Sequence, residues 1–168
     1  MIEKTSIGDF YERATATLPE GLTREIGHFN VFEIETLFDK KTGTRIMPYS
    51  RRSYYKISLI RGRNRAEYAD KVIEIRESAL LFATPKIPYH WLPQDENQSG
   101  LFCIFTEDFL SRNKAGINPD ELPIFRPGEL PVFQLSYEES QELEYIFRKM
   151  LKELGTDYIY KYDLLRNL

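Results

Sequence analysis

The chain has 168 residues, which fits one domain of ordinary size, and 42% of them are hydrophobic, as in a typical globular protein. The formal net charge of −3 gives no overall attraction to nucleic acid, and the single cysteine, Cys103, excludes an internal disulfide. No apolar run is long enough for a membrane helix, and the N-terminus lacks the apolar core of a signal peptide, so we expect a cytoplasmic protein without membrane contact.

Residues 28–38 (HFNVFEIETLF) alternate in a way that predicts a strand with one solvated face. The segment 39–44 (DKKTGT) predicts a turn with Gly43 at positive φ.

The stretch from residue 50 to residue 106 organises the rest of the chain. Apolar or alternating runs at 54–60, 79–83 and 101–105 are separated by turn-type clusters, of which Arg61 to Asn64 is the first. Residues 65–68 are expected to pair back as a hairpin, and 72–75 form the next short run. Frequent turns between short β-branched and aromatic runs predict a small antiparallel barrel or sandwich.

The run 54–60 places charged residues on both of its faces. Alternation puts Arg52, Tyr54, Lys56 and Ser58 on one side, and Arg61 on the other with three apolar residues. A cationic Lys56 in the interior would need a carboxylate, or an anionic or hydroxyl-rich ligand, as its partner. The alternative is that these charges form a solvated face, and a bulge before Arg61 would change the parity.

The segment PKIPYHW, residues 85–91, follows the run 79–83. Its two prolines favour a rigid, extended turn, after which Tyr89, His90 and Trp91 would lie at a strand mouth. Amphipathic rings in such a place often bind ligands, but Trp91 could equally plug the end of the barrel.

Beyond the barrel, residues 107–112 predict a helical turn, 122–125 an extended arm and 132–135 a last strand. Ser136 and Glu139 then have the spacing of a capping box, and Gly155 is placed to end the helix that this box begins. A second helix is expected over 158–168. The first helix carries one apolar stripe, which could pack on the barrel or form a dimer interface: Leu143, Ile146, Phe147, Met150, Leu151 and Leu154.

The chain carries no motif of a known catalytic site. Only two histidines are present, His28 and His90, and no nucleophile elbow, phosphate-binding loop, dinucleotide fingerprint or C-x-x-C pair occurs. A zinc or iron site usually needs three or four His, Cys or carboxylate ligands. We therefore expect neither an enzyme nor a metal or other cofactor.

Two long segments together resemble the N-terminal half of AraC-type bacterial transcription regulators. YYKISLIRGRNRAEYADKVIEIRESALLFATPKIPYHW followed by SGLFCIFTEDFL resembles their cupin domain, and LEYIFRKMLKELGTDYIYKYDLLRNL resembles their helical dimerisation and linker region. The resemblance implies a mainly β fold, a cupin double-stranded β-helix or jelly-roll barrel followed by two C-terminal α-helices. The effector-sensing barrel would span residues 1–135, and the dimerisation segment 136–168.

The resemblance also implies a function and a site. The chain would bind a small polar effector, a sugar or an organic acid, form a homodimer through its helices, and control a C-terminal helix-turn-helix domain that alone contacts DNA. At the positions of the cupin metal ligands stand Ser50, Arg52, Lys56 and Tyr89, so no metal is expected and the pocket would be basic. Arg61 matches an arginine that helps sugar-sensing members hold their ligand, and Trp91 completes the expected site. The alternative is a metal-dependent cupin enzyme, an isomerase or dioxygenase.

Overall fold

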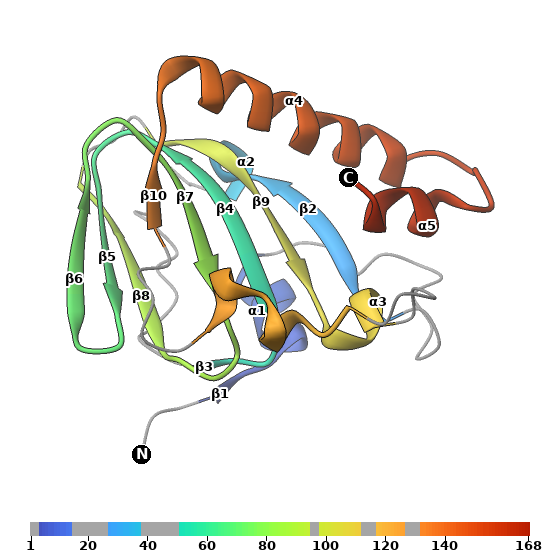
Figure 1. Cartoon of the computed structure of the whole chain (residues 1–168), viewed down its shortest axis with the longest axis horizontal. Helices are drawn as coiled ribbons and strands as arrows, with labels where there is room; N and C mark the ends of the chain where they lie inside the picture. The colour runs from blue at the N-terminus through green and yellow to red at the C-terminus, as the bar shows by residue number, and fades with distance from the viewer. Residues whose placement is uncertain (1–3, 15–26, 38–50, 95–97, 112–116, 127–131) are drawn as a thin grey trace.

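The computed structural model describes residues 4–14, 27–37, 51–94, 98–111, 117–126 and 132–168. In these residues two antiparallel sheets lie face to face, and helices cover the outer side of the larger sheet (Figure 1). The predicted turn at 39–44 and Ser50 lie outside the described residues.

The larger sheet has the strand order β10-β7-β4-β9-β2, and the smaller sheet the order β6-β5-β8. Every pairing within these two sheets is antiparallel. The strands of the larger sheet are β2 (Phe29–Glu33), β4 (Tyr55–Arg61), β7 (Ser78–Ala83), β9 (Ser99–Phe105) and β10 (Val132–Gln134). Those of the smaller sheet are β5 (Asn64–Tyr68), β6 (Lys71–Ile75) and β8 (Tyr89–Pro93).

A short parallel pair stands apart from both sheets: β1 (Lys4–Thr5) lies beside β3 (Arg51–Arg52). Among the described residues no strand pairing joins the two large sheets into a closed barrel. Their edges do meet at one point, where Gln134 Nε2 of β10 donates to the Glu74 carbonyl of β6 at 3.2 Å. The fold is therefore mainly β, as expected, with the β strands arranged as a sandwich that is open in this part of the chain.

The space between the sheets holds the first hydrophobic core. Ile60 and Phe102 of the larger sheet enter it from one side, and Tyr68 and Ile75 of the smaller sheet from the other. Phe10 of α1 (Ile7–Ala14) adds to this core, with edge-on contacts to the rings of Phe32, Tyr54 and Phe102.

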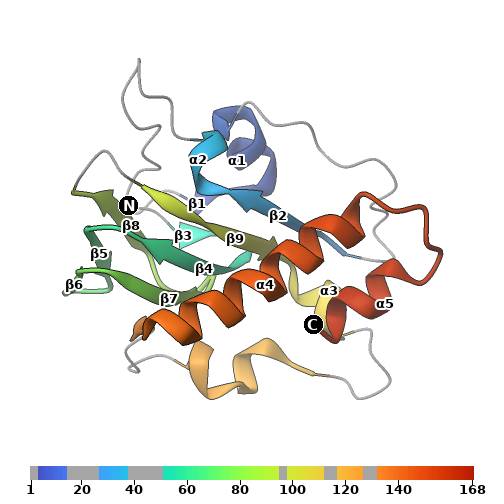
Figure 2. The ribbon, with the colours of Figure 1, turned by 90° about the horizontal axis from the view of Figure 1, so that it is seen from above.

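A second core lies on the outer side of the larger sheet. There α4 (Tyr137–Leu154) runs across β7, β4, β9 and β2, and α5 (Lys161–Arg166) turns back beside it (Figure 2). Because helices cover one face and the smaller sheet the other, the strands of the larger sheet are buried on both sides. This explains why 79–83 and 101–105 read as continuous apolar runs.

The strand predictions from 54 to 105 are confirmed with small changes of boundary. The prediction for 28–38 is partly wrong, because the strand ends at Glu33 and α2 (Ile34–Leu37) follows. The expected solvated face is also absent from this strand, since Phe29, Val31 and Phe32 are all buried.

Two further expectations need correction. Residues 122–125 are not an extended arm; two short 3-10 helices, η1 (Pro119–Glu121) and η2 (Pro123–Phe125), occupy this region, and each begins at a proline that suits a first helical turn. Tyr89, His90 and Trp91 were expected at a strand mouth, and they lie within strand β8 (Tyr89–Pro93). The helical turn predicted at 107–112 appears as α3 (Glu107–Ser111).

The capping box of α4 is present as predicted. Ser136 Oγ accepts from the Glu139 N–H at 3.2 Å, and Glu139 Oε2 accepts from the Ser136 N–H at 2.8 Å. Gly155 caps the C-terminal end with a φ of −80°, so its role here does not depend on left-handed geometry. The second helix, α5, is shorter than predicted. Within the described part of the chain, no helix combines the length and apolarity needed to cross a membrane.

Candidate functional site

Strand β4 presents different chemistry to its two sides. Lys56 and Ser58 face the smaller sheet, on the same side of β4 as the core residue Ile60. Arg61 faces the opposite way, toward α4, with Tyr55 and Leu59. The parity derived from the sequence is therefore correct, and no bulge disturbs the pairing of β4 with β7 or β9.

Three of the predicted ligand-binding residues meet between the sheets. Arg52 is only 2% exposed, and its guanidinium carbon lies 4.7 Å from the centroid of the Tyr89 ring. Arg52 Nη1 also donates to Thr5 Oγ1 at 3.4 Å. Lys56 Nζ lies 4.0 Å from the centroid of the Phe102 ring. Each cation thus lies over an aromatic face, an arrangement that offsets part of the cost of burying charge.

The charges in this group shift one another's protonation. Burial lowers the pKa of Lys56 from its ordinary value; the charge of Tyr89 opposes this shift, and the positive charge of Arg52 adds to it. Burial alone would raise the pKa of Tyr89, but the charges of Lys56 and Arg52, with a hydrogen bond from Arg52, outweigh burial and lower it. The two cations therefore favour a negative charge on the Tyr89 oxygen.

Trp91, two residues after Tyr89 on β8, faces the same interior. Its Nε1–H donates to Asn64 Oδ1 at 2.8 Å, and Asn64 Nδ2 in turn donates to the Gly62 carbonyl at 2.9 Å. Trp91 packs against the same core as Tyr54, Tyr68 and Phe102. The indole thus offers its ring to the interior, while its polar edge is already occupied.

The structure separates the two histidines. His28 is buried and bonds through Nε2 to the Tyr11 hydroxyl at 3.0 Å, whereas His90 lies on the outer side of the smaller sheet near Glu67, 3.6 Å away. Across the described ranges, no three His, Cys, Asp or Glu side chains are grouped so that they could hold a metal ion. Of the positions that the resemblance equated with metal ligands, Arg52, Lys56 and Tyr89 lie close together.

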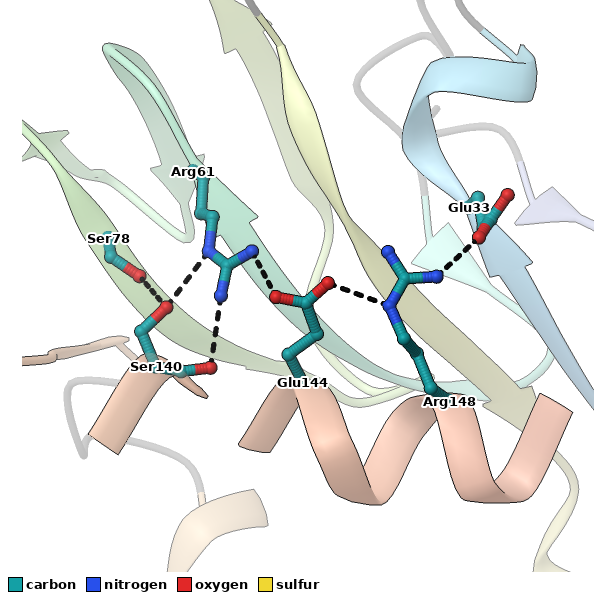
Figure 3. Close-up of polar contacts among 6 residues, drawn as sticks. All are labelled: Glu33, Arg61, Ser78, Ser140, Glu144 and Arg148. Carbon is teal, nitrogen blue, oxygen red and sulfur yellow. Dashed lines mark hydrogen bonds and ion pairs between the residues drawn. The ribbon is translucent and has the colours of Figure 1, made fainter. Parts of the chain in front are cut away.

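Arg61 does not join this interior group, contrary to the expectation that the resemblance gave. Its Nε donates to Ser140 Oγ at 2.9 Å and its Nη2 to the Ser140 carbonyl at 3.1 Å, while Nη1 pairs with the Glu144 carboxylate (Figure 3). Ser78 Oγ of β7 completes the contact by donating to Ser140 Oγ at 3.0 Å. Arg61 therefore fastens α4 to the outer face of the larger sheet.

The same polar network continues along the helix. Arg148 Nε bonds to Glu144 Oε1 at 2.7 Å, and Arg148 Nη1 bonds to Glu33 Oε1 of β2 at 2.8 Å (Figure 3). Sequence reasoning missed this network, although the spacing of Ser140, Glu144 and Arg148 at four-residue intervals places all three on one side of a helix. That spacing is the signal that could have indicated a polar ridge beside the apolar stripe.

The apolar stripe of α4 packs on its own sheet, which is the first of the two alternatives that the sequence left open for this stripe. Phe147 is 4% exposed within the second core, and Leu143, Met150, Leu151 and Leu154 pack around it. Ile146 is partly exposed and lies outside that core. The large hydrophobic side chains that stay exposed on the helical segment are different ones: Tyr137, Tyr145, Tyr158, Ile159 and Tyr160.

A scan of the sequence against models of known protein families found no match, and a search of curated proteins found none either.

Proposed function

We propose that the chain is the ligand-sensing and dimerising part of an AraC-type transcription regulator. In this proposal a metal-free cupin pocket between the two sheets binds a small polar effector, a sugar or an organic acid. The bound state controls how a C-terminal helix-turn-helix domain meets DNA. The observation that carries the proposal is that β4 presents Lys56 to the interior on one face and Arg61 to α4 on the other.

The strand order supports the cupin part of the proposal. Strands β2, β9, β4 and β7 lie side by side in the larger sheet, opposite β8, β5 and β6. Strands that are adjacent in the sequence, such as β4 and β5 or β7 and β8, lie in different sheets. Repeated crossing between two antiparallel sheets is the topology of a jelly roll.

The interior chemistry supports the binding of a ligand. No carboxylate of the described residues lies within ion-pair distance of Lys56 Nζ. Burying an ammonium without an anionic partner is energetically costly, so such groups occur chiefly at functional sites. A ligand that engages Lys56 differently in two states of the dimer would shift the balance between those states.

The contacts of the helical segment support a coupling between the interior site and the dimer. A movement of β4 would reach α4 through the contacts of Arg61 with Ser140 and Glu144, and α4 also contacts four strands of the larger sheet. Because the stripe around Phe147 is occupied by the sheet, the homodimer would use the exposed side of the segment, where Tyr145 and Ile159 lie.

Sedimentation velocity on the purified chain tests the dimer. We expect a dimer at micromolar concentration, and we expect Ile159→Glu combined with Tyr145→Glu to give a folded monomer. A wild-type chain that stays monomeric at high concentration would contradict the proposal. The circular dichroism spectrum of the variant provides the control for folding.

A further inference from the structure

We infer that the ligand of this interior site is a small organic carboxylate with an apolar or aromatic body, held through its carboxylate by Lys56 and the hydroxyl of Tyr89. The inference rests on the proposed function and narrows the class of effector. It assigns the anionic head of the ligand to the group of Lys56, Arg52 and Tyr89, and its body to the surrounding rings.

The first argument is charge. Register places alternate residues of each strand in the interior, and along β4, β5, β7, β8 and β9 none of these inward residues is Asp or Glu. Lys56 and Arg52 are both there, and they act on the same ring, Tyr89. An oxyanion would place a full negative charge beside Lys56, where no carboxylate of the described residues lies.

The second argument is hydrogen-bonding capacity. A sugar presents many hydroxyl groups, and each needs an acceptor as well as a donor in a buried site. The amides near the interior are already occupied: Asn64 by Trp91 and Gly62, and Asn30 by Tyr11 and the Val31 N–H. The interior holds the cations Lys56 and Arg52 and the hydroxyls of Ser58 and Tyr89, but none of the inward residues of these strands is a carboxylate, which favours an anion over a polyol.

The third argument concerns access and shape. Lys56 keeps part of its surface accessible, although Arg52, Tyr54 and Tyr89 are at most 4% exposed. The Phe102 ring lies against its ammonium, Tyr54 belongs to the same hydrophobic core as Phe102, and Trp91 packs against that core. An aromatic wall beside a partly buried lysine fits an acid with a hydrophobic body better than a bare inorganic ion.

Burial lowers the pKa of Lys56, so an arriving carboxylate would favour the protonated ammonium and raise that pKa again. Binding should then take up protons from solution, and it should weaken as the pH is raised. This linkage gives the inference a readout that the binding of a neutral ligand to the same rings would not show.

The experiment uses the 168-residue chain, its Lys56→Met variant and, as a matched control, Lys71→Met at an exposed position of β6. The probes are sodium benzoate and sodium hexanoate, their neutral amides, inorganic phosphate, arabinose and glucose, all at one ionic strength. Thermal unfolding and the fluorescence of Trp91, the only tryptophan, report binding.

We expect the carboxylates at millimolar concentration to raise the unfolding midpoint of the wild type by about 2 °C or more, while the amides, phosphate and sugars leave it unchanged. Without any probe, Lys56→Met should unfold at a higher temperature than the wild type, because it removes an uncompensated buried charge. The variant should no longer respond to carboxylates, and Lys71→Met should behave like the wild type.

The inference requires both the response of the wild type to carboxylates and the expected behaviour of the Lys56→Met variant. A response to sugars or phosphate without one to carboxylates overturns the assigned ligand class and leaves the proposed sensor function standing. A Lys56→Met variant that is less stable than the wild type, or one that still responds to carboxylates, overturns the role of Lys56. If no carboxylate binds the wild type, the inference fails, while sedimentation still decides the proposed dimer independently.

Discussion

His28, Tyr11 and Asn30 form a chain of hydrogen bonds whose directions follow from donor chemistry. Asn30 Nδ2 donates to the Tyr11 oxygen at 2.9 Å, and the Tyr11 hydroxyl shares a hydrogen bond of 3.0 Å with His28 Nε2. When His28 is the neutral tautomer with its proton on Nδ1, the hydroxyl donates and Nε2 accepts. Burial lowers the pKa of His28 to about 4, in agreement with this assignment, and raises that of Tyr11 to about 12.

A dependence of stability on pH follows from this geometry. An unfolded histidine titrates near pH 6.5 and folded His28 near 4, so between these values the unfolded state binds more protons. The stabilising effect is fully present above about pH 6.5 and is lost as the pH falls toward 4. We expect the free energy of unfolding to drop by about 2 kcal/mol across this window, measured by urea denaturation.

His28→Gln is the matched control, because its side-chain oxygen can still accept from Tyr11 but does not titrate. This variant should show a much flatter profile between pH 6.5 and 4. The carboxyls of Asp9, Asp120 and Glu144 have lowered pKa values, so they act mainly below this window. An unchanged slope in the variant would contradict the assignment to His28.

Single residues also show how far the sequence alone could lead. Alternation correctly separated Lys56 from Arg61, because side chains on a strand alternate between its two faces. The resemblance nevertheless placed both in one site. The sequence indicates which face a side chain is on, but it does not indicate that a helix eighty residues later covers the face of Arg61.

At the scale of elements, α4 joins a hydrophobic stripe and a polar ridge on adjacent faces. The stripe and the capping box could be recognised from spacing, because both depend on residues a few positions apart. The surface on which the stripe packs could not be predicted, since an amphipathic helix buries its apolar side equally well on a sheet or on a partner. The strand of residues 89–93 was missed because the prolines before it hid its alternation.

Shortening a buried side chain of the apolar stripe should lower the stability of the single chain. Phe147→Ala removes a ring that is 4% exposed beside residues of β2, β4 and β9, and we expect it to lower the free energy of unfolding by about 3 to 4 kcal/mol. Tyr145→Ala, on the same helix but 71% exposed, should change it by less than about 0.5 kcal/mol. Chemical denaturation distinguishes them, and equal effects would contradict the packing of α4.

The polar ridge gives a second comparison between matched substitutions. Arg61 and Glu144 expose only 24% and 17% of their side chains, whereas Arg65 and Glu74 on the neighbouring hairpin expose 44% and 55%. We expect Arg61→Met to destabilise the protein by about 1 to 2 kcal/mol, because Glu144 and the Ser140 carbonyl lose their donor. Arg65→Met should cost less than about 0.5 kcal/mol.

A double-mutant cycle with Glu144→Gln isolates the pair. The coupling between Arg61 and Glu144 should exceed the coupling between Arg65 and Glu74 measured in the same way. Equal couplings would mean that the partly buried position of the ridge contributes nothing beyond an ordinary surface pair.

For the whole molecule, the larger sheet is a layer shared by two cores, one facing the smaller sheet and one facing α4 and α5. The sequence indicated a β part followed by a helical part, since the change of hydrophobic period is local. It could not indicate that the helical part lies on the same sheet that lines the candidate site. That arrangement depends on contacts between residues far apart in the chain.

Hydrogen exchange should show that the two cores are connected through the larger sheet. A carboxylate that raises the unfolding temperature is expected to slow amide exchange in β4 and also in the first turns of α4, because Arg61 joins the two. In Arg61→Met the slowing should be confined to the strands. Protection of α4 that persists in this variant would show that another contact carries the coupling.

Only Leu135 and Ser136 separate the end of β10 from the start of α4. An α-helix turns about 100° for each residue, so adding or deleting one residue at this junction would rotate the whole helix about its axis. Phe147 would leave the sheet and Glu144 would swing away from Arg61. The length of this two-residue joint therefore sets the angular phase of α4, and changes of length there should be far more damaging than substitutions that keep it.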